Sequence, residues 1–158
     1  MKHTLKLTTP SDRVIVMTRT FNAPRRLVFD AFTKPELLKR WFGAIGGFEL
    51  VVCEVATKPG QKYRYVWQGP DGSRMGLGGV CQEFVAPERM KATGKFEESW
   101  YPGEELSTTT FVEHEGQTTV TMHVEYNSKE TRDMVLKSPM EMGVGAGYDM
   151  LETLLKGE

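Results

Sequence analysis

The chain has 158 residues, 39% of them hydrophobic and 26% charged, with a net charge of −1, which is the profile of one globular domain and excludes a disordered or fibrous protein. Its 20 Lys and Arg residues are dispersed among 21 acidic residues, so we expect no basic face and no nucleic-acid partner. No apolar run approaches the roughly 20 residues that cross a bilayer, and the first residues lack the apolar core of a signal peptide. We therefore expect no membrane insertion and a cytoplasmic protein.

The chain begins with a polar stretch. We expect an N-terminal arm over residues 1–11 and a single domain over residues 12–158. Residues 13–21, RVIVMTRTF, are rich in β-branched side chains and predict the first strand. The two cysteines, Cys53 and Cys81, lie far apart without a Cys-x-x-Cys motif or neighbouring His. We expect both to be reduced, partly buried apolar side chains and no zinc site.

Two short helices are predicted after this strand. Asn22 is placed to cap a helix over residues 24–33, where apolar residues recur at helical spacing. Pro35 disfavours helical geometry in the residue before it, so the helix stops there and a second short one follows. Gly43 is expected to end that helix in a left-handed conformation.

From residue 48 onward the pattern is extended, with turn-forming residues between the segments. Six strands in hairpin succession predict an antiparallel meander. In the second strand, alternation places Tyr63, Tyr65 and Trp67 on one face. The six segments are 48–55, 62–68, 75–85, 90–100, 107–115 and 118–126.

The C-terminal part predicts one long helix. Ser128 is a suitable N-cap, and Pro139 is expected to kink or interrupt the helix. Gly143, Gly145 and Gly147 each cost roughly 1 kcal/mol of helix propensity relative to Ala. Two interpretations remain open: the glycines allow close packing on the sheet, or they loosen one turn so that it can move.

The order of elements predicts an α+β fold, in which the C-terminal helix covers one face of the sheet. The segments FNAPRRLVFDAFTKPELLKRWFG, GVCQEFVAPERM and MEMGVGAGYDMLETLL resemble the bacterial relatives of the Hsp90 ATPase activator, within the START-like superfamily. The resemblance covers nearly the whole chain. It implies a helix-grip fold, in which a curved antiparallel sheet of about six or seven strands wraps around the C-terminal helix and leaves an internal apolar cavity.

The chain departs from the family pattern at three positions. Phe42 and Ala44 replace a Trp and a Pro, and Val144 replaces a Trp on the last helix. If the family placement holds, the smaller Val144 enlarges the cavity and changes the preferred ligand.

Candidate cavity residues follow from this placement, because aromatic side chains with a polar handle suit an apolar ligand pocket. Trp41 and Phe42 either pack the end of the core or line the mouth of the cavity. The other aromatic residues are equally compatible with plain core packing. The candidates are Phe32, Trp41, Phe42, Tyr63, Tyr65, Trp67, Met75, Trp100, Met122, Val144, Tyr148 and Leu151.

Catalytic signatures are weak. His3, His114 and His123 lie on a tail, in a turn and on a strand, and no metalloprotease, nucleophile-elbow or Walker motif is present. The run GLGG at 76–79 lies within a predicted strand, so a bulge or a close backbone contact is favoured over a phosphate loop.

Four charged residues are candidates for binding a ligand or transferring a proton. Asp30 and Glu83 would gain a raised pKa if they pointed into the cavity, and Arg64 and Arg74 could hold a ligand carboxylate. We expect all four to face solvent, and we expect no catalytic residue, metal or cofactor.

Three functions are compatible with these observations. The first is non-catalytic binding of a small hydrophobic or aromatic molecule between the sheet and the last helix. The second is a contact with an Hsp90-type chaperone, as in the eukaryotic namesake of the family. The third is a cyclase- or hydrolase-like enzyme, which a buried carboxylate beside a cavity tyrosine would favour. The resemblance also implies that a homodimer is common.

Overall fold

The computed structural model describes residues 4–43, 47–98 and 100–157. His3 and Ala44, considered above, lie outside these ranges. The strands are β1 (Lys6–Ser11), β2 (Val14–Phe21), β3 (Glu49–Glu54), β4 (Lys62–Gln68), β5 (Arg74–Val85), β6 (Arg89–Phe96), β7 (Glu105–His114) and β8 (Gln117–Glu125). The helices are α1 (Arg25–Thr33), α2 (Pro35–Leu38), α3 (Lys129–Lys137) and α4 (Met140–Leu155).

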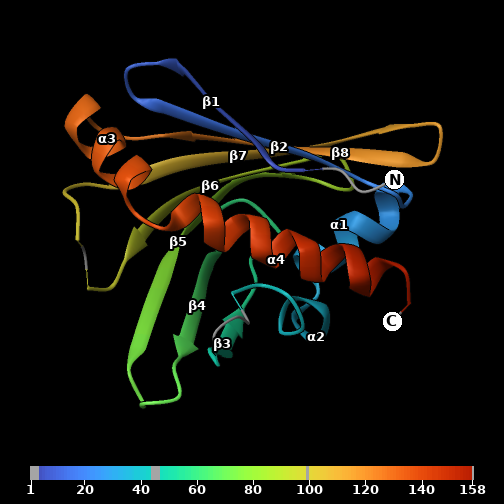
Figure 1. The fold of residues 1–158 in the computed structure, drawn as a ribbon, viewed down its shortest axis with the longest axis horizontal. Helices are drawn as coiled ribbons and strands as arrows, with labels where there is room; N and C mark the ends of the chain where they lie inside the picture. The colour runs from blue at the N-terminus through green and yellow to red at the C-terminus, as the bar shows by residue number, and fades with distance from the viewer. Residues whose placement is uncertain (1–3, 44–46, 99, 158) are drawn as a thin grey trace.

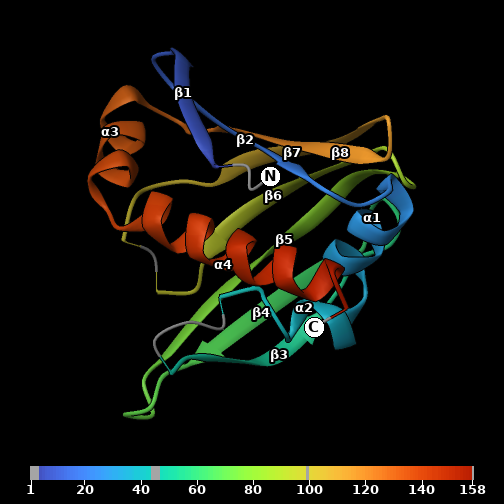
Figure 2. The ribbon, with the colours of Figure 1, turned by 45° about the vertical axis from the view of Figure 1, so that its right-hand side comes forward.

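The strands form one antiparallel sheet in the order β1-β2-β8-β7-β6-β5-β4-β3. Figures 1 and 2 show that the sheet is strongly curved and that α4 runs across one of its faces, with α1 and α2 at one end of α4 and α3 at the other. We call the face toward α4 the inner face. This is the predicted α+β arrangement of a curved sheet around a C-terminal helix.

The sheet has eight strands, so the prediction of six or seven was too low. The additional strand is β1, which lies within the stretch predicted to be a polar arm and pairs with β2 from Lys6 opposite Thr18. Most residues of β1 are exposed. An edge strand with two exposed faces needs no apolar alternation, and for this reason its sequence resembled a tail.

The predicted helices are present, with two corrections to their ends. Asn22 does not cap α1: Pro24 occupies the N-cap position without a side-chain cap bond, and Asn22 Oδ1 accepts a hydrogen bond from Gln117 Nε2 at 2.6 Å. Gly43 has a φ of 72°, which confirms its left-handed conformation, but it does not end the second helix: α2 ends at Leu38 with Lys39 as its C-cap.

The C-terminal helix is interrupted as Pro139 predicted. Ser128 caps α3 by accepting a hydrogen bond from the Thr131 amide, and α4 begins directly after Pro139. Because α3 and α4 are separate helices, α4 can lie across the inner face while α3 packs at the far end of the sheet (Figure 1).

The backbones of β5 and β6 approach each other closely at Gly79. A Cβ atom on Gly79 would lie 1.9 Å from the carbonyl oxygen of Thr93, a distance that no side chain can accept. The GLGG run therefore makes a close backbone contact within a strand, as predicted, and allows β6 to fold over β5.

Candidate functional site

The inner face of the sheet changes character along its strands. At the α1 and α2 end it carries large buried side chains, including Phe21, Phe111 and Trp67. Toward the middle it carries small ones: Ala92 of β6 lies opposite Ser107 of β7. Because directly paired residues share a face, these small residues form a shallow region of the inner face.

Several apolar side chains of the inner face are only half-buried although α4 runs across that face (Figure 2), whereas Cys81 and Val124, the direct partners of Ala92 and Ser107, are buried. They come from strands β4, β5, β6 and β8 and from α4, so the inner face is less completely covered there than at the end next to α1 and α2. The half-buried residues are Tyr65, Leu77, Phe84, Met90, Phe96, Met122, Met140 and Val144.

The structure divides the candidate cavity residues into three groups. Trp41, Trp67, Tyr148 and Leu151 are buried in the core. Met75 and Trp100 lie at the surface, with 45% and 42% of their area exposed. The half-buried members are Phe32, Phe42, Tyr63, Tyr65, Met122 and Val144.

The aromatic pair Trp41 and Phe42 is part of a continuous cluster of rings. Trp41 contacts Phe42, with 5.4 Å between the ring centroids, and Tyr148 at 5.9 Å. The Trp41 indole N–H donates to the Ala31 carbonyl at 3.0 Å, and that of Trp67 donates to the Phe42 carbonyl at 2.9 Å. Since both indole donors are satisfied by backbone, these rings pack the end of the core.

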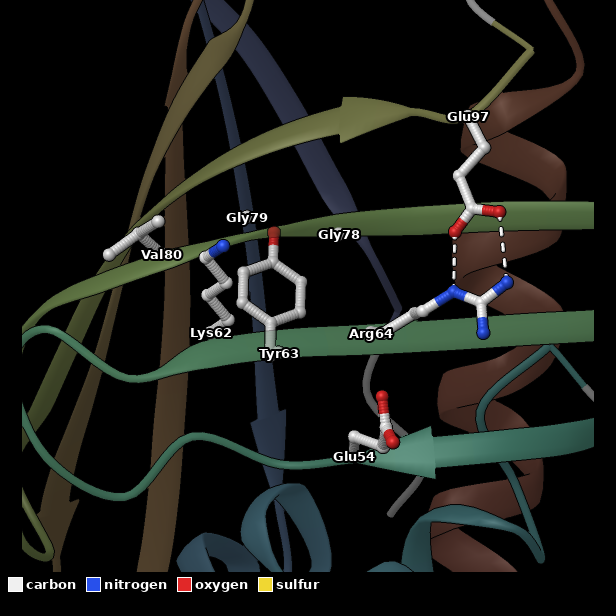
Figure 3. Close-up of a pocket in the computed structure, with 8 residues that line it drawn as sticks. All are labelled: Glu54, Lys62, Tyr63, Arg64, Gly78, Gly79, Val80 and Glu97. Atoms are coloured by element: carbon white, nitrogen blue, oxygen red, sulfur yellow. Dashed lines mark hydrogen bonds and ion pairs between the residues drawn. The ribbon is translucent and has the colours of Figure 1, made fainter.

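The predicted face of β4 is confirmed. Tyr63 and Tyr65 are in ring contact at 5.3 Å, and Tyr65 and Trp67 at 6.1 Å. Figure 3 shows the Tyr63 side chain reaching toward β5 at Gly79. Its hydroxyl donates to the Thr93 carbonyl at 2.7 Å. Tyr63 is thereby held across β5.

A carboxyl group lies beside Tyr63 on the inner face. Glu105 pairs with Gly94 across β6 and β7, and it accepts a hydrogen bond from the hydroxyl of Tyr126. Burial raises its pKa to about 7, which the Tyr126 bond partly counteracts. We call Glu105, Tyr63, Tyr101 and Tyr126 the Glu105 cluster.

The charge of Glu105 affects the three tyrosines of the Glu105 cluster. The pKa values of Tyr63, Tyr101 and Tyr126 are all raised, first by burial and next by the charge of Glu105. Their hydroxyls therefore stay protonated at every physiological pH. Sequence reasoning missed Glu105, because it is the last residue of the turn-like segment YPGEE, where a glutamate is normally solvated.

A second buried polar group lies between β2 and α4. Arg19 is only 2% exposed, and its Nη1 pairs with Asp149 Oδ1 at 2.7 Å. Its other two nitrogens, the Tyr148 hydroxyl and both carboxylate oxygens of Glu152 are buried without hydrogen-bond partners among the described residues. Sequence reasoning missed Glu152, because it lies beside the apolar residues of α4 and a helix glutamate is normally expected at the surface.

Two pockets stand out, and no residue of α4 lines either. The first, of about 320 Å³, is lined by residues of β3, β4 and β5 and by Glu97. Figure 3 shows Arg64 and Glu97 joined there by two hydrogen bonds, of 2.7 and 3.1 Å. The second, of about 450 Å³, contains Trp100 and Lys95. Trp100 therefore borders a surface pocket, away from the space beneath α4.

Of the other charged candidates, Arg74 is exposed as expected, whereas Glu83 and Asp30 are partly buried, with 35% and 18% of their side chains exposed. Glu83 pairs with Arg89, Asp30 lies within 3.6 Å of Lys34 on α1, and Arg74 donates to Gln68 at 2.8 Å. His114 and His123 are exposed. In the described ranges, no three His, Cys, Asp or Glu side chains lie close enough together to hold a metal ion.

The glycines of α4 are not explained by close packing alone. At Gly143 and Gly145 an added Cβ would meet nothing within 4 Å. At Gly147 it would lie 3.4 Å from the Trp41 carbonyl oxygen, an ordinary contact. No helix among the described residues has the length and apolar character needed to cross a membrane.

Comparison with solved structures gives close matches over nearly the whole chain. A protein from Rhodobacter sphaeroides is 29% identical, with a TM-score of 0.92 over 98% of this chain and 99% of that one. Protein Ms6760 from Mycobacterium smegmatis is 22% identical, with a TM-score of 0.84 over 96% and 97%. Protein NE0264 from Nitrosomonas europaea is 24% identical, with a TM-score of 0.81 over 94% and 97%. The last two establish the fold alone.

No curated protein matches this chain. The family model described as "Activator of Hsp90 ATPase homolog 1-like protein" matches residues 22–156, which contain both short helices, strands β3 to β8 and the C-terminal helices. The chain belongs to the Activator of Hsp90 ATPase homolog 1-like family.

Proposed function

We propose that this protein binds a small apolar or aromatic molecule between the inner face of the sheet and the N-terminal half of α4. The observation that carries the proposal is the set of half-buried apolar side chains on the inner face. A face that is covered by a helix yet incompletely buried gains free energy when an apolar guest excludes the remaining water.

The physical scale of this gain is adequate for a metabolite-sized guest. Burial of roughly 200 Å² of apolar ligand surface at about 25 cal/mol per Å² contributes about 5 kcal/mol. The aromatic end of the core supports the site as a rigid wall, because its rings are in mutual contact and both of its indole donors are already satisfied.

The helix α4 would form the movable side of the site. Gly143 and Gly145 lie in its N-terminal half, on either side of Val144. A Cβ atom added at either glycine would meet no other atom within 4 Å. Helix propensity is therefore low in the part of α4 that covers the shallow region, whereas Tyr148 and Leu151 anchor its C-terminal half in the core.

A second candidate function rests on one observation. Glu105 is a carboxyl group with a pKa of about 7 that is hydrogen-bonded to Tyr126, and a pKa near the working pH suits a general acid or base. A proton-transfer enzyme would convert its guest. Incubation of the protein with a bound guest, followed by NMR of the small molecule, separates conversion from simple binding.

The binding proposal is tested with a blocking variant and a matched control. Ser107→Phe places a ring in the shallow region, whereas Val112→Phe places the same ring on the outer face of the same strand, where Val112 is 60% exposed. We expect 2-naphthylmethanol to bind the natural protein and the Val112 variant, and to bind the Ser107 variant at least about tenfold more weakly.

A second blocking variant, Ala92→Leu, covers the case in which Ser107→Phe does not fold. Equal binding by the folded blocking variants and the control would refute the proposed site. Native mass spectrometry of gently purified protein should detect a retained guest. Recovery of Hsp90 with the protein, together with a change in its ATPase rate, would favour chaperone contact instead.

A further inference from the structure

The carboxyl group of Glu105 carries a negative charge once the pH exceeds its pKa of about 7. Glu105 is half-buried on the inner face, and among the described residues no Lys, Arg or His nitrogen forms an ion pair with its carboxylate. Its hydrogen-bond partner, Tyr126, is neutral. Two other carboxylates near these strands differ from it: Glu97 is paired with Arg64, and Glu83 with Arg89.

The surroundings of Glu105 are aromatic. Tyr101 and Tyr126 are in edge-to-face contact, with 5.9 Å between their centroids, and Phe96 contacts Tyr101 at 6.1 Å. Tyr63 approaches from the other side of Gly94. Aromatic faces attract cations. A metal ion would have to give up tightly held water to lie against these rings, so rings around a carboxylate favour an organic cation over a hydrated metal ion.

Two oxygen atoms converge over Gly94, where the backbone carries no side chain. A Cβ atom built on Gly94 would lie 2.8 Å from Glu105 Oε1 and 3.0 Å from Tyr63 Oη. The Tyr63 hydroxyl already donates its proton to Thr93, so it faces Gly94 as an acceptor. Both atoms can therefore accept hydrogen bonds, and the position suits a group that has several donors and no acceptor.

We propose that the Glu105 cluster binds the ammonium group of an organic amine, whose apolar body lies over the small residues Ala92 and Ser107 toward α4. An ammonium group supplies the missing positive charge, donates to Glu105 and Tyr63, and lies against the tyrosine rings. A ligand carboxylate would be repelled by Glu105. This inference rests on the proposed function and names the chemical class of its ligand.

The ionisation of Glu105 makes the proposed interaction dependent on pH. Burial raises the pKa of Glu105 to about 7, so the carboxylate is present above that pH. The titratable groups that face Glu105 are Tyr63, Tyr101 and Tyr126, whose pKa values its charge raises, and Glu104 acts on Tyr63. The three tyrosines remain neutral. The affinity for an amine should therefore fall as the pH drops from about 8 to about 5.5.

The test uses two probes of the same shape: 2-naphthylmethylamine, which is a cation at neutral pH, and 2-naphthylmethanol, which is neutral. Calorimetry measures both with the natural protein, with Glu105→Gln and with Glu104→Gln. Glu104 is the exposed neighbour of Glu105, so its variant controls for the change in net charge. We expect the natural protein to prefer the amine by at least about tenfold at pH 8.

The Glu105→Gln variant should lose that preference while it keeps its affinity for the alcohol, and Glu104→Gln should change neither by more than about twofold. Equal affinities of the natural protein for the two probes would overturn the amine inference and leave the proposed function standing. If neither probe binds, the proposed function fails as well. Unchanged amine affinity between pH 5.5 and 8 also contradicts the role of Glu105.

Discussion

Replacement of Glu105 by Gln should stabilise the protein at high pH and have little effect at low pH. Burial raises the pKa of Glu105 from its ordinary value of 4.5 to about 7. Because the folded-state pKa lies above the unfolded one, the native state holds the proton more tightly. The resulting stability is fully present below pH 4.5 and is lost as the pH rises through 7.

The magnitude follows from the two pKa values. Each unit of pKa difference corresponds to about 1.4 kcal/mol, so the free energy of unfolding falls by about 3 kcal/mol when Glu105 ionises. Urea unfolding, followed by tryptophan fluorescence, gives the free energy of unfolding of both proteins at about pH 5 and about pH 8.5. The advantage of Glu105→Gln over the natural protein should grow by about 2 to 3 kcal/mol between these conditions.

Glu97→Gln is the matched control. Its hydrogen bond with Arg64 lowers the pKa of Glu97, so this carboxylate is ionised throughout that interval and the effect of the substitution should stay constant. An equally constant difference for Glu105→Gln would refute the reasoning, because it would mean that Glu105 titrates at the same pH in the folded and unfolded states.

Three further stability predictions concern other positions. Gly79→Ala should lower the free energy of unfolding by at least about 2 kcal/mol, because its Cβ would overlap the Thr93 carbonyl oxygen; a neutral effect in urea unfolding would contradict the close contact. Gly145→Ala should raise it by about 0.5 to 1 kcal/mol, since an added Cβ meets nothing, and a loss would show that α4 requires glycine there. Glu152→Met should raise the melting temperature, corresponding to at least about 1 kcal/mol, because both carboxylate oxygens are buried without partners; a lower melting temperature would indicate that Glu152 makes a stabilising interaction.

The elements that carry strong local signals could be predicted from the sequence. The alternation of β4 placed Tyr63, Tyr65 and Trp67 on one face, Pro139 marked the break before α4, and Gly43 has the predicted left-handed conformation. Each signal reflects a constraint within a few residues along the chain: side-chain period, a missing amide proton, or a left-handed conformation.

Long-range features could not be predicted in this way. Strand β1 is polar because it lies at the edge of the sheet, and Asn22 bonds to Gln117 on a distant strand instead of capping α1. Glu105 belongs to a turn-like sequence, yet pairing of β6 with β7 brings it beside Gly94 and Tyr63. The environment of a charged side chain depends on which strands meet, and a single sequence contains no local signal for that.

The methionine side chains allow the central claim to be tested directly, because they lie both inside and outside the proposed site. Met122 and Met140 are half-buried and pack against the buried cluster that contains Ile15 and Val124. Met134 and Met142 are 42% and 75% exposed. Protein labelled with ¹³C at the methionine methyls can be titrated with 2-naphthylmethanol, and contacts to its aromatic protons measured by NMR. The account predicts contacts to Met122 and Met140 and none to Met134 and Met142. Contacts confined to the exposed methyls, or no contacts at saturating probe, would contradict a binding site beneath α4.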